Sequence, residues 1–157
     1  MKLQMDNILF LCIGDSNIAG DSLGPLIGSF IDVNKHKIQT NTNIKVIGTM
    51  NSPIGYNTIN ETVKNIDTNV FTVLIDSALG SENNIGKIVI DNSNLCAGKG
   101  VNIGKNLTGD ITIRGIVGKN HENIKLNTLE LKTIPANKID IMANKIVSIL
   151  LAFLCTV

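Results

Sequence analysis

Two aspartates stand where the chain could place acid–base or metal chemistry. Asp21 lies in a Gly-rich turn after the apolar run 8–13 and just before a helical pattern, and Asp76 directly follows the apolar run 70–75. Polar side chains at the carboxyl ends of parallel strands gather at one edge of a sheet, where α/β proteins bind ligands. Two carboxyl groups that meet there can share a proton, which raises one pKa, or can ligate a metal through oxygen.

Each aspartate also has an ordinary structural explanation. Asp21 is well placed to cap the helix that follows it, by accepting hydrogen bonds from the first backbone amides. On the functional interpretation its carboxylate points into the crevice beyond the strand ends, where the helix N-terminus would stabilise the anion and lower its pKa. Asp76 could equally be a turn or cap residue, since Gly80 follows it closely.

A metal site at this edge would need a further ligand beside the two aspartates. His121 is the candidate, because it follows the predicted strand 111–117 by a few residues. The alternative for His121 is simple exposure in a loop, which is common for a lone histidine.

A Gly-rich segment, Gly98-Lys99-Gly100-Val101-Asn102, offers a loop that could approach a ligand. It lacks Walker spacing and opens no helical pattern, so a flexible crossing loop is the favoured interpretation. The three cysteines, Cys12, Cys96 and Cys155, show neither a CxxC spacing nor a Cys–His nucleophile pattern.

The elements that must position these residues follow from hydrophobic periodicity. Continuous apolar runs predict buried parallel strands, and spacings of three and four predict helices. Strands are predicted at 8–13, 44–48, 70–75, 87–90 and 111–117, and helices at 22–33, 57–67 and 135–154. Residues 92–108 are predicted to be loop, and 119–134 fit either a strand in two pieces or a short helix.

The order of these elements predicts an α/β fold. Its first half reads β-α-β-α-β, which implies parallel pairing with helices on both faces of the sheet. No linker or repeat divides the 157 residues, so we expect one three-layer α/β/α domain over 1–157 with a mainly parallel sheet.

Composition and charge indicate which partners and which compartment to expect. A net charge of +1 without a long basic run argues against nucleic acid as a partner. The apolar stretch 146–157 is shorter than the ~20 residues of a membrane span, and no signal peptide is evident. We therefore expect a cytoplasmic protein that does not bind a membrane.

Four motifs in a fixed order carry a resemblance to a known family. They are Gly20-Asp21-Ser22-Leu23-Gly24-Pro25, Ile75-Asp76-Ser77-Ala78-Leu79-Gly80, Gly98-Lys99-Gly100-Val101-Asn102 and Gly109-Asp110-Ile111-Thr112-Ile113. With Pro53 after the second strand, this pattern resembles the YyaC-like sporulation protein family of endospore-forming bacteria. That family is similar to the spore germination protease and, more distantly, to the hydrogenase maturation endopeptidases. The resemblance covers most of the chain and implies a phosphorylase/hydrolase-like fold.

The resemblance also implies roles for particular residues. The proposed catalytic acids of the germination protease correspond to Asp21 and Asp76. Gly20, Ser22, Gly98 and Asn102 of the matching motifs are then expected to bind substrate. In the hydrogenase maturation enzymes two acids and a later histidine bind nickel; Asp21 and Asp76 match the acids, and His121 matches the histidine loosely.

The chain departs from the family pattern around the first motif. Ser16 and Asn17 stand where the family has a charged Asp-Arg pair, and Gly55 replaces a histidine. The segment 119–131 matches poorly.

These observations lead to one expected function and two alternatives. The expectation is a sporulation-associated peptidase that uses Asp21 and Asp76 on a protein or peptide, with small acid-soluble spore proteins as the candidate substrate. It would need no cofactor and would work in the cytoplasm of a sporulating cell or spore. The alternatives are a non-catalytic module that binds a peptide or partner, and a hydrolase using a divalent metal held by Asp21, Asp76 and His121. The oligomeric state is not predicted.

Overall fold

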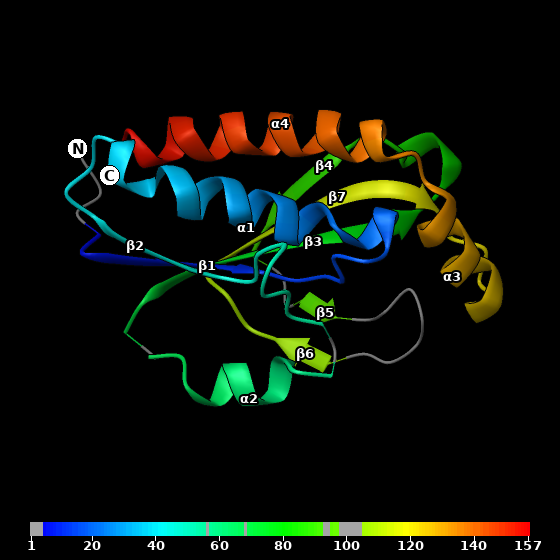
Figure 1. The fold of residues 1–157 in the computed structure, drawn as a ribbon, viewed down its shortest axis with the longest axis horizontal. Coiled ribbons are helices and arrows are strands. Elements are labelled where there is room, and N and C mark those ends of the chain that lie inside the picture. The colour runs from blue at the N-terminus through cyan, green and yellow to red at the C-terminus, as the bar shows by residue number, and fades with distance from the viewer. Residues whose placement is uncertain (1–4, 56, 68, 93–94, 98–104) are drawn as a thin grey trace.

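The computed structural model describes residues 5–55, 57–67, 69–92, 95–97 and 105–157, which form an α/β fold (Figure 1). The strands and longer helices follow in the order β1 (Asn7–Cys12), α1 (Leu23–Asn34), β2 (Asn43–Ile47), α2 (Ile59–Lys64), β3 (Phe71–Gly80), β4 (Ile88–Asp91), β5 (Leu95–Ala97), β6 (Lys105–Leu107), β7 (Ile111–Lys119), α3 (Ile124–Thr133) and α4 (Ala136–Leu154). A short 3-10 turn, η1 (Ala19–Asp21), precedes α1.

The central sheet places β1 and β3 side by side. Its strand order is β2-β1-β3-β7-β4, and only the pairing of β4 with β7 is antiparallel. The chain leaves β1 toward β2 on one side and returns to β3 on the other side. The carboxyl ends of β1 and β3 therefore flank the point where the strand order reverses, which is where open α/β sheets bind ligands.

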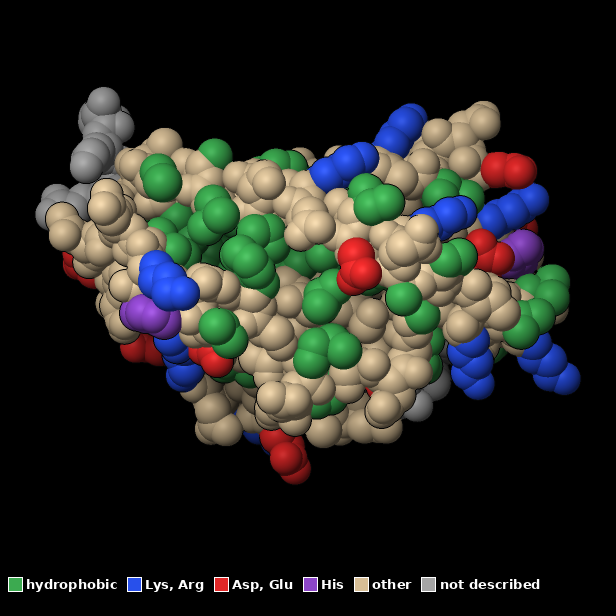
Figure 2. Space-filling view, turned by 45° about the horizontal axis from the view of Figure 1, so that its top comes forward, with side chains coloured by type: hydrophobic (Ala, Val, Ile, Leu, Met, Phe, Trp, Pro, Cys, Tyr) green, Lys and Arg blue, Asp and Glu red, His purple; other side chains and the backbone are tan. Residues whose placement is uncertain are grey.

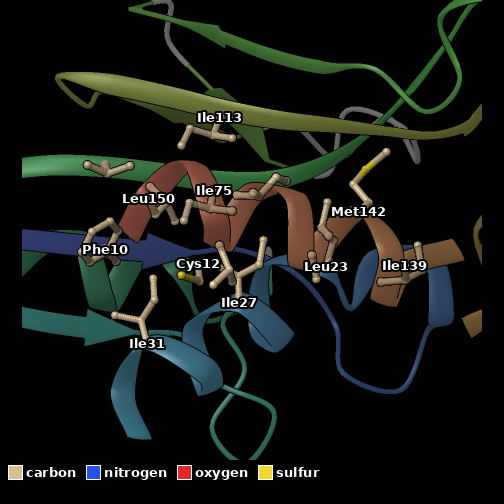
Figure 3. Close-up of a cluster of buried hydrophobic side chains, with 14 of the residues drawn as sticks. Phe10, Cys12, Leu23, Ile27, Ile31, Ile75, Ile113, Ile139, Met142 and Leu150 are labelled. Atoms are coloured by element: carbon tan, nitrogen blue, oxygen red, sulfur yellow. The ribbon is translucent and has the colours of Figure 1, made fainter. Parts of the chain in front are cut away.

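Helices lie on both faces of this sheet. In Figure 1, α1 and α4 lie along one face and α2 lies on the other, which confirms the expected arrangement of layers. Alternate side chains of β1 pack on opposite faces of the sheet, because successive side chains of a strand point in opposite directions. Phe10 and Cys12 pack in the cluster under α1 and α4 (Figure 3), whereas Leu11 and Ile13 pack with Ile59 of α2.

The larger of the two apolar clusters is built from aliphatic side chains. Leu23 and Ile27 of α1 are fully buried in one cluster with Ile75 of β3 (Figure 3), and Ile146 of α4 belongs to the same cluster. Burial of one such side chain stabilises the fold by about 1.5–3 kcal/mol. Apolar side chains also gather on the outer surface over α1 and α4 (Figure 2), among them Phe30, Val33 and Ile149.

Most predicted elements are confirmed, and three segments differ. The predicted strand 70–75 continues to Gly80 because β7 is longer than expected and supplies partners as far as Lys119. Within the predicted loop 92–108, β5 and β6 pair as a small antiparallel sheet. The helix predicted over 57–67 is shorter and spans Ile59–Lys64.

The ambiguous segment 119–134 contains a helix, α3. The side chain of Asn123 starts it by accepting a hydrogen bond from the backbone N–H of Leu126 at 3.1 Å. Ile124 and Leu126 are exposed while Leu131 is buried, so the apolar residues do not mark one buried stripe. That pattern explains why periodicity alone did not decide between helix and strand.

In the described part of the chain, no helix combines the length and the apolar character that a membrane span requires.

Close contact of α1 with β1 depends on Gly24. A Cβ at this position would collide with the backbone of Ile13, including its carbonyl oxygen, which has no flexible side-chain end to move aside. We predict that Gly24→Ala lowers the free energy of unfolding by about 2–4 kcal/mol. Gly55→Ala is the matched control, since a Cβ there meets nothing within 4 Å. Urea denaturation measures both variants, and equal stabilities would contradict this account of the packing.

Candidate active site

Asp21 is held beyond the end of β1 by a turn that folds back on itself. The backbone N–H of Asp15 donates to Oδ2 of Asp21 at 2.9 Å. Gly14 makes this turn possible: its φ is +148°, and a Cβ there would collide with the carbonyl oxygen of Asp21. The turn therefore fixes the carboxyl group over the edge of the sheet.

Asp21 does not cap α1, contrary to one expectation from the sequence. Ser22 occupies the N-cap position, and no side chain caps the helix there. The carboxyl group of Asp21 instead accepts hydrogen bonds from Asp15 and from the hydroxyl of Ser77.

Asp76 lies inside β3, at the point where β3 loses its neighbour β1. The last backbone hydrogen bond between these two segments runs from the N–H of Ile13 to the carbonyl oxygen of Ile75 at 2.8 Å. Beyond it β3 continues paired to β7, where Asp76 lies opposite Arg114. Asp76 is 7% exposed, so it is a buried acid just beyond the last residue of β3 that pairs with β1.

Ser77 joins the two acids. Its hydroxyl donates to Oδ1 of Asp21 at 3.3 Å, and its backbone N–H donates to Oδ1 of Asp76 at 2.8 Å. The structure thus brings together the two aspartates singled out in the sequence. The sequence analysis assigned no role to Ser77, although a hydroxyl group directly after Asp76 could have indicated a hydrogen-bond donor in the site.

Burial raises the pKa of both carboxyl groups, and repulsion by Asp21 adds to the rise at Asp76. Burial raises the pKa of Asp21 to about 6, although the hydrogen bonds from Asp15 and Ser77 oppose this change. Burial, and next the charge of Asp21, raise the pKa of Asp76, against the Ser77 hydrogen bond and the charge of Arg114. The expected lowering of the Asp21 pKa by a helix N-terminus was wrong. Two acids in this relation favour a state with one proton on the pair.

Arg114 extends the charged row from Asp76 across the sheet. It lies opposite Asp76 on β7, and its guanidinium group forms an ion pair with the carboxylate of Asp91 on β4. Arg114 therefore lies between two carboxyl groups, and its charge lowers the pKa of Asp76 against the effect of burial.

The other predicted substrate-binding residues support the site or lie outside the described residues. Gly20 is buried, and a Cβ there would lie 2.7 Å from the carbonyl oxygen of Leu131, so Gly20 allows α3 to pack on η1. The hydroxyl of Ser22 donates to the carbonyl oxygen of Ala19 at 2.7 Å, within the turn. Gly98 and Asn102 lie outside the residues that the structure describes.

His121 is not placed with the aspartates. Its Nε2 lies 3.0 Å from Oε2 of Glu130, and its backbone N–H donates to Asn127. Over the described ranges, no three His, Cys, Asp or Glu side chains lie together as a metal site would require. The predicted ligand set of Asp21, Asp76 and His121 is therefore not assembled in this structure.

Cys12 is not a candidate nucleophile for the site. Cys12 is buried in the core, and burial raises the pKa of its thiol far above the usual range. Such a thiol stays protonated and unreactive.

Comparison with known proteins relates the chain to a family and to a fold. The model of the family described as "Protein of unknown function (DUF1256)" matches residues 1–149. "Uncharacterized protein YyaC" of Bacillus subtilis (strain 168) is 33% identical over 113 residues, which are 70% of this chain and 53% of the relative. The chain thus matches about half the length of that relative.

Two solved structures share the fold. The [NiFe] hydrogenase maturation protease HycI from Thermococcus kodakarensis KOD1 has a TM-score of 0.57 at 16% identity, covering 95% of this chain and 92% of its own. The [NiFe] hydrogenase maturation protease HybD from Thermococcus kodakarensis has a TM-score of 0.51 at 16% identity, covering 94% and 99%. At this identity they show the fold alone.

The raised pKa values predict that removing either acid stabilises the protein near neutral pH. A carboxyl group with a folded pKa above its unfolded value contributes stability below the unfolded pKa, and this contribution is lost as the pH rises through the folded pKa. For Asp21 that interval runs from its ordinary value of 3.8 to about 6. We expect Asp21→Asn to raise the free energy of unfolding by about 2 kcal/mol at pH 7 and by little at pH 4, and Asp76→Asn to raise it at pH 7 as well.

Urea denaturation at the two pH values measures this difference. The control is Asp32→Asn, which changes an exposed acid on α1 whose partner is Lys35. Equal or lower stability of both site variants at pH 7 would show that the two carboxyl groups are not strained by burial and by each other.

Proposed function

The chain belongs to the DUF1256 family, and from this premise we propose that it is a peptidase in which Asp21 and Asp76 activate water at a peptide carbonyl. The observation that carries the proposal is the pair of buried acids joined through Ser77. A fold shared with two maturation proteases supports it.

The surroundings of the two acids suggest a separate role for each. The Ser77 hydroxyl donates to Asp21, and donation to a carboxylate favours its charged form. Asp21 is then the base that takes a proton from water. Asp76, buried beside that charge, keeps its proton and is the acid.

The reaction then follows the chemistry of a shared-proton pair. Water loses a proton to Asp21 as its oxygen bonds to the carbonyl carbon, and Asp76 gives its proton to the carbonyl oxygen. Collapse of the tetrahedral intermediate breaks the C–N bond. The proton on Asp21 passes to the leaving amine, and the new carboxyl group returns a proton to Asp76. The net change is hydrolysis of one peptide bond.

The substrate and setting come from the resemblance to the YyaC-like family. We propose a protein substrate in the cytoplasm of a sporulating cell or spore, with small acid-soluble spore proteins as the first candidates. The site needs no metal for this reaction, although a divalent ion on the two carboxylates is a variant that metal analysis can test.

A non-catalytic binding module is the second candidate. Its motivation is Gly55, where the resembled family has a histidine. A Cβ at Gly55 would meet no heavy atom within 4 Å, so there is space at this position for a side chain that glycine does not supply. On this alternative the paired acids would bind a peptide terminus without cleaving it.

Replacing either acid should abolish hydrolysis. The assay incubates small acid-soluble spore proteins and a peptide library with wild type, Asp21→Asn, Asp76→Asn and the control Asp32→Asn, and mass spectrometry detects the products. We expect each site variant to lower kcat by about 100-fold or more, while the control stays active. An inactive wild type that still captures peptide would favour the binding module. Full activity in both site variants would remove the catalytic assignment.

Ser77 should set the acidic limb of the pH profile. With Asp21 as base, the rate should rise with pH through about 6 and fall where Asp76 loses its proton. Loss of the Ser77 hydroxyl removes a bond to the Asp21 carboxylate, so Ser77→Ala should move the acidic limb to higher pH. Ser77→Thr keeps a hydroxyl and should restore it. The same limb in wild type and Ser77→Ala would mean that Ser77 does not tune the base.

A further inference from the structure

The two edges of the central sheet differ in their side chains. The sheet ends at β2 on one side and at β4 on the other, and none of the described strands pairs with the outer side of β4. β2 has the exposed Lys45 in its middle, and a charge there discourages pairing with another chain. β4 has the sequence Ile-Val-Ile-Asp, in which Val89 is 38% exposed and Ile90 is 49% exposed. The middle of β4 is therefore an apolar edge that lacks this protection.

Backbone hydrogen bonds define which residues of β4 can pair outward. The carbonyl oxygen of Lys87 accepts from the backbone N–H of Ile116 at 2.9 Å, so the backbone of Lys87 faces β7. Backbone direction alternates along an antiparallel strand, so the backbone of Val89 also faces β7. The N–H and C=O groups of Ile88 and Ile90 therefore face the open side.

The side chains of β4 alternate between the two faces of the sheet. Ile88 packs against the large apolar cluster, so Ile88 and Ile90 lie on the face that α1 and α4 cover. Lys87, Val89 and Asp91 alternate with them and lie on the other face. That second face of the edge thus carries a cation, an apolar side chain and an anion in a row.

These directions restrict how β4 can pair with β4 of a second copy. Opposite residues must both have outward backbone groups, so a two-fold axis can lie only at Ile88, Val89 or Ile90. An axis at Val89 places Ile88 opposite Ile90 of the second copy. It also places Val89 opposite its own copy and Lys87 opposite Asp91. An axis at Ile88 or at Ile90 brings no opposite charges together.

The charges at the two ends of β4 therefore favour the axis at Val89. Oppositely charged residues that face each other across an antiparallel pair are attractive, whereas like charges repel. An edge with charges of one sign would repel its own copy, but Lys87 and Asp91 attract theirs. Asp91 also forms an ion pair with Arg114, and a carboxylate can accept from more than one cation.

We propose that the protein forms a symmetric dimer in which β4 pairs antiparallel with β4 of a second copy about a two-fold axis at Val89. Ile88 and Ile90 make the backbone hydrogen bonds, and the two five-stranded sheets become one continuous sheet. On the α4 face, Ile88 and Ile90 of the two copies meet and extend the apolar clusters across the axis. On the other face, Val89 meets its copy between two Lys87–Asp91 pairs.

The dimer keeps the two candidate active sites apart. β3, β7 and β4 are adjacent in the sheet, so the β3 strands of the two copies lie five strand spacings apart, about 24 Å. Each copy then holds its own pair of acids, and neither completes the site of the other. The proposal therefore does not depend on the proposed peptidase function.

Sedimentation equilibrium of the full chain tests the proposal. We expect wild type to approach twice its mass of 16.8 kDa, with a dissociation constant of about 1–100 µM because the contact is narrow. Lys87→Glu should raise this constant about tenfold or more, since it sets two carboxylates against each other at both ends. Val89→Lys should do the same, since it places two lysines on the axis. Val33→Lys, at a 64% exposed apolar residue of α1, is the control and should leave the constant unchanged.

Cysteine crosslinking tests the register. In a Cys155→Ser background, which removes an exposed thiol, Val89→Cys should give a disulfide-linked dimer on mild oxidation. Opposite residues of a non-bonded pair have Cα atoms about 4.5 Å apart, within the range of a disulfide. Ile90→Cys is the control: its own copy lies diagonally at about 7–8 Å, so it should not crosslink above the background protein.

The results that would overturn the proposal are specific. A monomer at every concentration up to about 1 mM would remove the dimer. A dimer that Val33→Lys dissociates, while Lys87→Glu and Val89→Lys leave it intact, would assign the contact to α1 and not to β4. Equal crosslinking of Val89→Cys and Ile90→Cys would contradict the axis at Val89. A dimer with all the expected responses but no hydrolysis of protein substrates would support this inference and remove the peptidase function.

Discussion

The candidate site depends on two buried carboxyl groups, because a charge on Asp21 disfavours a charge on Asp76. Burial raises the pKa of each, and the charge of Asp21 raises that of Asp76 further. Ser77 holds the arrangement, because it donates one hydrogen bond to each acid from adjacent atoms of one residue. Both bonds favour the charged form of their acid, so the deeper burial of Asp76 and the charge of Asp21 beside it make the two acids chemically different.

The two acids lie where β1 ends and its neighbour β3 continues. β1 ends at Cys12, while β3 and β7 continue together past Asp76. The end of β1 leaves space into which the turn after Gly14 carries Asp21. Tight packing on either side of the turn, at Gly20 against α3 and at Gly24 against β1, keeps the turn in place. The glycines of the first motif therefore allow close backbone packing, and Asp21 supplies the reactive carboxyl group.

The sequence predicted that the two acids lie at the same edge of the sheet, but it did not predict their hydrogen-bond partners. Strand ends are visible as the ends of apolar runs, so Asp21 and Asp76 could be assigned to one edge of a parallel sheet. The role of Ser77 was not predicted, because it depends on the extension of β3 beyond its apolar run. His121 was grouped with the acids by chain order, whereas the fold of α3 places Glu130 beside it. Side-chain partners across distant segments leave no periodic pattern, and that is why these contacts required a structure.

The shared proton is the central claim, and a carboxyl titration tests it directly. NMR detection of the side-chain carboxyl carbons, with Asp21→Asn and Asp76→Asn used for assignment, follows both groups in the intact protein from pH 3 to 9. We predict two coupled steps, one near 6 and one higher, and a lower pKa for Asp76 once Asp21 is replaced by Asn. Independent titration of both groups near the ordinary value of an aspartate, about 4, would contradict the account.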